Sequence, residues 1–185
     1  MKQLAIKDTL FDEFMALPEN QVGEIIHNVL YTQPRPAPKH TRTYSALGYT
    51  VAGPFDGGIG GPGGWWILDE PELHIEGHIL VPDLAGWKRE RMPELPETAW
   101  FECVPDWVCE ILSPSTSQKD RIIKMPVYAD LGVKYLWIID PLIQTLEVYQ
   151  LENKHWILMA SLRRDDKVSA IPFDAIEFGL DSLWA

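Results

Sequence analysis

The sequence predicts an α/β (α+β) fold in which a central mixed β-sheet is flanked by helices. Short apolar runs rich in Val, Ile, Trp and Tyr alternate with a few stretches whose apolar residues recur at helical spacing. Some of these runs are separated only by short turn-forming segments, which is typical of antiparallel hairpins. Because no linker divides the 185 residues into two parts, we expect residues 1–185 to form one domain.

The first predicted element is an N-terminal helix over residues 7–17. Its apolar residues recur at helical spacing, Asp8 or Thr9 offers a capping side chain, and Pro18 ends the pattern. The later elements follow from similar local signals. They are a strand–turn–strand over 22–33 with its turn at His27 and Asn28, a helix over 40–52, two or three antiparallel strands over 65–87, an irregular excursion over 88–105, a short strand over 106–112, a turn and helix over 113–132 ended by Gly132, a buried strand over 134–140, a hairpin over 145–162 that turns at 152–154, and a last strand with a closing segment over 168–184.

Composition and charge exclude several classes of protein. No apolar run reaches the roughly 20 residues of a membrane span, and the N-terminus lacks the features of a signal peptide. Two cysteines, Cys103 and Cys109, are too few for a disulfide framework, so we expect a soluble cytoplasmic protein. The net charge of −11 argues against a passive DNA coat. It does not exclude an enzyme that holds a divalent cation between carboxylates.

The glycine-rich segment over residues 53–64 is the one low-complexity stretch. It contains no G-x-x-x-x-G-K-[ST] loop, and it does not combine a strand, a GxGxxG pattern and a helix. We therefore expect a mobile surface loop rather than a phosphate cradle.

Two acids stand out because each lies next to apolar residues. Asp83 follows Pro82 at the end of HILVPD, and Glu110 lies inside WVCEIL. A buried carboxylate is costly unless it is paired or holds a metal, so neighbouring strands with one acid each would suit Mg²⁺. The alternatives are that Asp83 is a turn residue and that Glu110 forms a salt bridge with Lys124 or Arg121.

Lys124 lies on the predicted helix after SPSTS. Helical spacing places Asp120 and Lys124 on one face, and Tyr128 one turn further. Lys124 could polarise an attacking water or stabilise charge on a phosphate. The alternative is a solvated surface lysine that pairs with Asp120.

A separate metal site could be built on His74, Glu76 and His78. Alternation along one strand would place these three side chains on one face. Gly77 between them indicates a turn, however, and their spacing differs from the His-x-His pair of metal-binding β-barrels.

Several segments together resemble a known family. The run VPDLAGW, then PDWVCEILSPSTSQKDRIIKMPVYADLGVKYLWIIDP, then LEVYQL is similar to the Uma-type family of restriction endonucleases. That family is assigned to the PD-(D/E)XK nuclease superfamily. GEIIHNVLY with PRPAPKH resembles its N-terminal block, and GGPGGWWILDEPELHI its middle, so the resemblance covers about residues 20–180.

The resemblance implies a restriction-endonuclease-like mixed sheet and a phosphodiesterase site that depends on Mg²⁺ or Mn²⁺. Asp83 matches the motif aspartate and Glu110 the second metal-binding carboxylate, with the backbone carbonyl of Ile111 as a further ligand. Glu24 matches the family's N-terminal acid and would orient the attacking water. The superfamily has a lysine two residues after the second acid, where this chain has Leu112. Lys124, on the following helix, is the candidate for the missing cation.

The first functional hypothesis is therefore a metal-dependent endonuclease that acts on nucleic acid, with DNA as the expected substrate and no membrane partner. A homodimer is compatible with this hypothesis because the superfamily includes many homodimers. The alternative is a catalytically silent binding or assembly protein that keeps the nuclease fold. Leu112, the net charge of −11 and the eight Trp residues favour this alternative.

Overall fold

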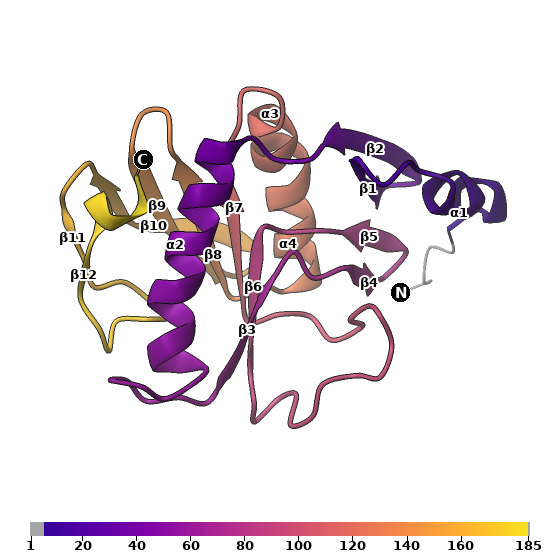
Figure 1. Cartoon of the computed structure of the whole chain (residues 1–185). Coiled ribbons are helices and arrows are strands. Elements are labelled where there is room, and N and C mark those ends of the chain that lie inside the picture. Colours follow the sequence, from indigo (N-terminus) through magenta and orange to yellow (C-terminus); the bar gives the residue numbers. More distant parts are fainter. Residues whose placement is uncertain (1–5, 185) are drawn as a thin grey trace.

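Two antiparallel hairpins and a mixed sheet form the framework of the protein, for which a computed structural model describes residues 6–184 (Figure 1). The helices are α1 (Asp8–Met15), α2 (Pro38–Phe55), α3 (Ser117–Lys119) and α4 (Met125–Leu131), with a π-helical turn η1 (Asp120–Lys124) and a 3₁₀ turn η2 (Leu180–Leu183). The strands are β1 (Gln21–Ile26), β2 (Val29–Pro34), β3 (Trp65–Asp69), β4 (Leu73–Ile75), β5 (His78–Leu80), β6 (Leu84–Lys88), β7 (Trp107–Ile111), β8 (Tyr135–Asp140), β9 (Thr145–Glu152), β10 (His155–Arg163), β11 (Lys167–Val168) and β12 (Phe178–Gly179).

The central sheet has six strands in the order β10-β9-β8-β7-β6-β3, and β7 and β8 form its parallel pair. A parallel pair needs a crossover connection, and α3, η1 and α4 together supply it. The mixed sheet flanked by helices confirms the predicted fold class.

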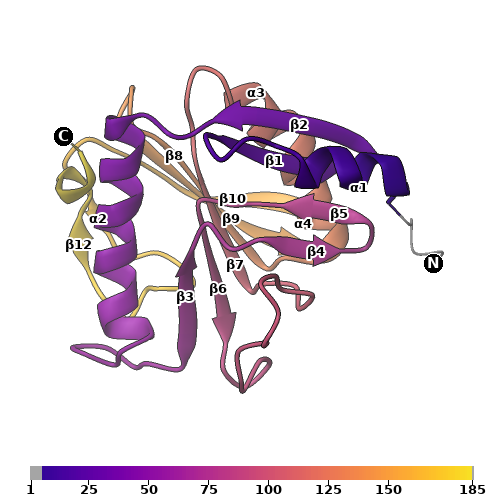
Figure 2. The same cartoon turned by 45° about the vertical axis from the view of Figure 1, so that its right-hand side comes forward.

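The two faces of the central sheet are covered by different helices (Figure 2). Successive residues of a strand point to opposite faces, and the burial of β7 follows this rule. Trp107 and Cys109 belong to the hydrophobic cluster that includes Leu47 of α2. Val108 belongs to the cluster that includes Val127 of α4. Glu110 is two residues after Val108 on β7, so its side chain points to the same face of the sheet, toward the crossover helices.

The second sheet has the order β2-β1-β5-β4 and projects from one side of the central sheet (Figure 2). Its β1–β2 hairpin turns at His27 and Asn28, which both have positive φ values, as the sequence predicts. The predicted two or three strands over residues 65–87 are in fact four, β3 to β6. The additional break is a tight turn at Glu76 and Gly77, where φ is +49° and +80°.

The predicted helix over residues 40–52 is longer than expected at both ends. It begins at Pro38, whose fixed φ suits a first helical turn, and continues through Pro54 to Phe55. Helix α1 lies within its predicted range of 7–17 but is shorter, and its cap residue is Lys7 rather than Asp8 or Thr9. In the described part of the chain, no helix is both long enough and apolar enough to cross a membrane.

The helix that leads to β8 is interrupted by the π turn η1. Pro126, near the start of α4, has no N–H to donate, and its ring crowds the carbonyl of the preceding turn. A wider turn relieves this conflict, and π turns inside helices are frequent at functional sites. Asp120 and Lys124, the two ends of η1, are both buried.

Candidate active site

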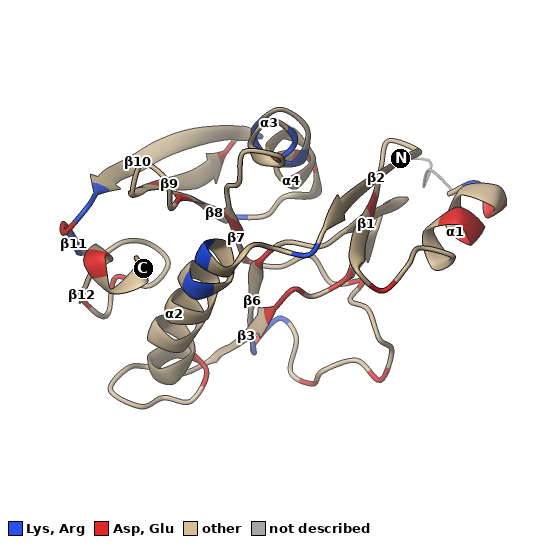
Figure 3. Ribbon diagram, turned by 45° about the horizontal axis from the view of Figure 1, so that its top comes forward, with Lys and Arg blue, Asp and Glu red and all other residues tan. Residues whose placement is uncertain are grey.

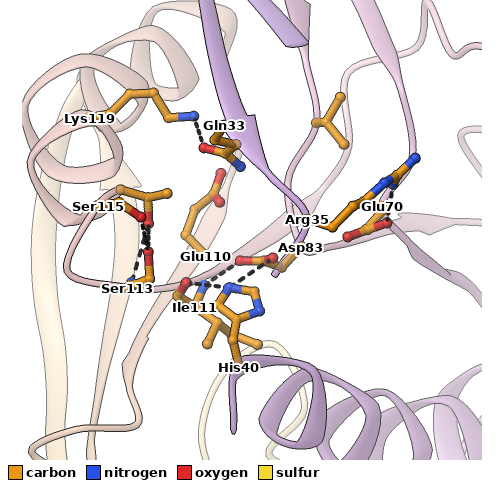
Figure 4. Close-up of polar contacts among 12 residues, drawn as sticks. Gln33, Arg35, His40, Glu70, Asp83, Glu110, Ile111, Ser113, Ser115 and Lys119 are labelled. Carbon is orange, nitrogen blue, oxygen red and sulfur yellow. Dashed lines mark hydrogen bonds and ion pairs between the residues drawn. The ribbon is translucent and has the colours of Figure 1, made fainter. Parts of the chain in front are cut away.

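A cleft with a volume of about 200 Å³ opens where the ends of β2, β6 and β7 meet the start of α2 and the turn before α3 (Figure 4). Sequence-predicted residues Asp83, Glu110, Ile111 and Lys124 line it. Arg35 lies at its rim, 3.6 Å from Glu70. Four of the five site residues predicted from the sequence thus lie on one cavity, and the fifth, Glu24, contacts Lys124 directly below it.

Lys124 is the centre of a buried cluster of charges. Its Nζ lies 2.7 Å from Glu110 Oε1 and 2.8 Å from Glu24 Oε1, and it donates a hydrogen bond to the carbonyl of Val81 at 3.2 Å. The side chains of Lys124, Glu110 and Glu24 are all at most 3% exposed. Because β1, β7 and the segment after β5 supply these contacts to a lysine on η1, the position of the ammonium group is fixed by the tertiary fold.

The lysine position of the superfamily pattern is filled by an apolar side chain. Leu112 is 3% exposed and belongs to the hydrophobic cluster on the α4 side of the sheet. Lys124 enters the site from η1 instead, and its Nζ reaches the same carboxylate that precedes Leu112. The fold therefore brings the ammonium group of Lys124 to Glu110, although β7 itself carries no lysine.

Glu110 is held by two donors on one oxygen. Tyr128 of α4 donates a hydrogen bond to Glu110 Oε1 at 2.6 Å, beside the ion pair with Lys124. Burial raises the pKa of Glu110 to about 8, opposed by the charge of Lys124 and reinforced by the charges of Asp120, Asp83 and Glu24. Burial and the neighbouring acids together thus outweigh the effect of Lys124 on Glu110.

The other members of the cluster respond to the same charges. Burial alone would lower the pKa of Lys124, but Glu110 and Glu24 raise it well above its ordinary value. Burial alone would raise the pKa of Glu24, but Lys124 and Lys119 lower it. Lys124 and Glu24 are therefore a charged pair at neutral pH.

Asp83 is fixed by β7 and by α2. The N–H of Ile111 donates to Asp83 Oδ2 at 2.6 Å, and His40 Nε2 lies 3.2 Å from Asp83 Oδ1. The same His40 nitrogen lies 2.7 Å from the carbonyl oxygen of Ile111 (Figure 4). Burial alone would lower the pKa of His40, but Asp83 and the Ile111 carbonyl raise it.

Sequence reasoning did not identify His40 or Lys119. His40 lies in the segment PRPAPKH, where the local pattern predicts only the start of a helix. Lys119 donates hydrogen bonds to Glu24 Oε2 and, at 2.6 Å, to Gln33 Oε1. An α-helical pattern places Lys119 and Lys124 on different faces, and the π turn between them is not visible in the sequence.

The alternative site of His74, Glu76 and His78 does not form. In the β4–β5 hairpin His74 pairs with Ile79 and Ile75 with His78, so the two histidines point to opposite faces. His74 instead contacts the Glu72 carboxylate at 2.6 Å.

The donors of the cleft fit a hard divalent cation that has few protein ligands. Within residues 6–184 no group of three or more His, Cys, Asp or Glu side chains forms a metal-binding set. Mg²⁺, however, commonly takes one or two carboxylates and completes its coordination with water and substrate phosphate. The described polar contacts of Glu110 both fall on Oε1, which leaves Oε2 available. A bound cation would also favour the ionised form of Glu110, which burial and the neighbouring acids disfavour.

Comparison with known proteins places the fold in a class of nuclease-like proteins. The chain is similar to a crystal structure described as "a putative nuclease belonging to DUF820 from Anabaena variabilis", with a TM-score of 0.73 and 26% sequence identity over 93% of this chain and 95% of that one. The chain belongs to the Uma2 family, described as "Putative restriction endonuclease", which matches residues 11–181. The family predicted from the sequence is thus confirmed. A search of the curated proteins finds no match.

Proposed function

We propose that the protein is an endonuclease that hydrolyses phosphodiester bonds in DNA and requires Mg²⁺ or Mn²⁺. The family and its nuclease-like neighbour support a nuclease in general. The observation that carries the finer proposal is the contact of Lys124 with Glu110 at 2.7 Å, at the base of a cleft that also contains Asp83. Two acidic side chains and one basic side chain, here Asp83, Glu110 and Lys124, are the residue types that a metal-dependent phosphodiesterase uses.

Each residue has a distinct proposed role. Asp83, Glu110 and the carbonyl of Ile111 would hold the ion, which when bound would neutralise phosphate charge and promote attack by water. Ile111 N–H fixes Asp83 in place before substrate arrives. Lys124 stabilises the charge that develops on the phosphate as the 3′ oxygen leaves. Its raised pKa supports this electrostatic role rather than that of a general base, because the ammonium keeps its proton.

The contacts of Glu24 support a role different from the one expected from the sequence. Its Oε1 accepts a hydrogen bond from Val81 N–H at 2.8 Å and contacts Lys124, and its Oε2 contacts Lys119. With both oxygens engaged, Glu24 is suited to position the two lysines rather than to orient the attacking water. We therefore propose Glu24 as a positioning residue.

The protein can approach a polyanion despite its net charge of −11. Lys and Arg residues gather at the start of α2 and around α3, and these two segments border the cleft (Figure 3). Local basic groups and a bound cation would offset the overall repulsion, and binding would weaken steeply with salt. The cytoplasmic location, the homodimer and the organisation of residues 1–185 as one domain remain predictions.

A cleavage assay tests the proposal. Supercoiled plasmid, linear duplex, single-stranded DNA and RNA are incubated at low salt with Mg²⁺, Mn²⁺ or EDTA. We expect DNA to be cut only with a divalent ion, and Asp83→Asn and Lys124→Met to lose at least about 100-fold in rate. Asp174→Asn, at an exposed position, and Lys154→Met, whose ion pair is exposed, are the matched controls.

Asp83→Asn is the more informative of the two variants. Asparagine keeps an oxygen that can accept the Ile111 N–H, so the variant removes charge with little change in packing. If no substrate is cut and Mg²⁺ leaves the melting temperature unchanged, the catalytically silent binding protein is the better description. Cutting that persists in EDTA would contradict the metal requirement.

A further inference from the structure

His40 occupies an unusual place in the cleft. Its Nε2 lies 2.7 Å from the carbonyl oxygen of Ile111 and 3.2 Å from Asp83 Oδ1. These are two of the three groups that we propose as metal ligands. The His40 side chain is only 11% exposed, and its Nδ1 is a buried atom without a hydrogen-bond partner in the described structure.

The spacing of these three atoms matches that of a coordination shell. In an octahedral site with metal–ligand distances of about 2.1 Å, neighbouring ligands lie about 3 Å from one another. His40 Nε2 is at this spacing from both oxygens. A cation that binds Asp83 Oδ1 and the Ile111 carbonyl is therefore within reach of the imidazole nitrogen.

The local fold keeps His40 close to these oxygens. Pro38 starts α2 two residues earlier, and the first turn of the helix directs His40 toward the end of β7. Since Nδ1 has no partner, the ring is held through Nε2 and can adjust by a small rotation about its side-chain bonds. Exchange of the Nε2 proton for a metal ion would leave the remaining contacts of the helix in place.

We propose that His40 Nε2 is a ligand of the catalytic metal and that it makes the site selective for Mn²⁺ over Mg²⁺. Imidazole is a good ligand for first-row transition ions, whereas Mg²⁺ prefers carboxylate, carbonyl and water oxygens. Asp83, Glu110 and the Ile111 carbonyl alone form an all-oxygen site. With the small ring rotation described above, His40 would convert it into a mixed oxygen and nitrogen site, a set of three side chains that the described residues do not hold ready-made. This inference rests on the proposed function, since it concerns the same metal site.

Metal binding without substrate provides the test. Isothermal titration of the wild-type protein with MnCl₂ and with MgCl₂ gives the two affinities, and pulsed electron paramagnetic resonance of the Mn²⁺-loaded protein detects ¹⁴N coupling to a coordinated imidazole. We expect tighter Mn²⁺ than Mg²⁺ binding and a clear ¹⁴N coupling in the wild-type protein.

His40→Gln supplies the conservative variant, because its amide replaces the ring nitrogen by an oxygen donor. We expect Mn²⁺ affinity to fall about 10- to 100-fold, Mg²⁺ affinity to change less than about threefold, and the ¹⁴N coupling to disappear. His155→Gln, at an exposed hairpin position, is the matched control and should behave as the wild-type protein. The wild-type spectrum keeps the test valid even if His40→Gln does not fold.

The outcomes separate the two proposals. If wild-type protein binds Mn²⁺ in a manner that Asp83→Asn abolishes, but shows no ¹⁴N coupling, His40 is not a ligand and the metal site stands. Equal affinity of wild-type and His40→Gln protein for Mn²⁺ would also overturn the role of His40. If the wild-type protein binds neither ion, both proposals fail.

Discussion

Lys124 and Glu24 form a buried ion pair that joins the two larger sheets: Lys124 Nζ, from the crossover on the six-stranded sheet, lies 2.8 Å from Glu24 Oε1 on the four-stranded sheet. The contact is unusual because both side chains are at most 2% exposed. Removal of one partner from such a pair leaves an uncompensated charge in the protein interior. The pair therefore links the candidate site to the stability of the fold.

Lys124→Met should destabilise the protein by about 3–5 kcal/mol, because it leaves Glu24 and Glu110 buried with less compensating charge. Urea denaturation in EDTA measures the change. Lys154→Met removes an ion pair with Asp130 in which both side chains are more than 60% exposed, and it should change the free energy of unfolding by less than about 1 kcal/mol. Equal effects of the two variants would show that Lys124 is not stabilised by the carboxylates.

The metal-free protein should lose stability as the pH rises from about 4.5 to 8. The pKa of Glu110 is about 8 in the folded protein against an ordinary value of 4.5. Between these values the folded state binds more protons than the unfolded state, so the free energy of unfolding falls as the pH rises. His40 and Asp120, whose pKa values are also raised, act in the same direction. The lowered pKa values of Glu24 and His78 act in the opposite direction, each below the ordinary value of its group.

Thermal unfolding in EDTA at several pH values checks this prediction. Glu110→Gln removes the largest contribution, so its melting temperature should depend less on pH between about 5 and 8 than that of the wild-type protein. Added Mg²⁺ or Mn²⁺ should displace the proton from Glu110, and calorimetry in buffers of different ionisation enthalpy should detect proton release near pH 7. Parallel pH profiles of wild-type and Glu110→Gln protein would contradict the raised pKa.

Local signals in the sequence predicted most of the fold. Local residue preferences predict both the hairpin turn at His27 and Asn28 and the helix end at Gly132. Asn and Gly readily adopt the positive φ values that these positions have. The strands β4 and β5 were merged with their neighbours because three residues are too few to show an alternating pattern. Elements of this length depend on tertiary pairing rather than on local periodicity.

The site was predicted less completely, for a physical reason. Glu110 lies inside an apolar strand and Asp83 between two apolar strands, and a costly burial of that kind is visible in the sequence. Lys119 and His40 lie in polar or irregular segments, where a charged or polar residue needs no explanation. Their roles depend on the π turn η1 and on where α2 meets β7, which are properties of the assembled fold.

Tyr128→Phe should show whether the Tyr128 hydroxyl only holds Glu110 in place or also takes part in the reaction. The variant removes the hydrogen bond to Glu110 Oε1 but leaves Lys124 in contact with the same oxygen. We expect a loss of about 1 kcal/mol in stability and a fall in cleavage rate of less than about 10-fold, with little change in KM. Chemical denaturation and steady-state cleavage kinetics measure these effects. A loss as large as that of Lys124→Met would indicate that the Tyr128 hydroxyl takes part in the reaction.

Gly86→Ala should destabilise the central sheet, because there is no room for a methyl group on β6. A Cβ at this position would lie 3.0 Å from Ile67 Cδ1, 3.2 Å from Trp107 Cε3 and 3.3 Å from Trp65 Cε3. Overpacking of this kind costs about 1–3 kcal/mol, measured as a lower urea midpoint with an unchanged slope. Gly53→Ala is the matched control: it lies in α2, and a Cβ there meets no atom within 4 Å beyond the two neighbouring residues. Alanine favours a helix interior, but Pro54 disfavours a helical residue with a Cβ just before it, so we expect a net change of less than about 1 kcal/mol. If both variants were equally stable, Trp65 and Trp107 would have to move apart easily, contrary to the close packing of β6 between β3 and β7.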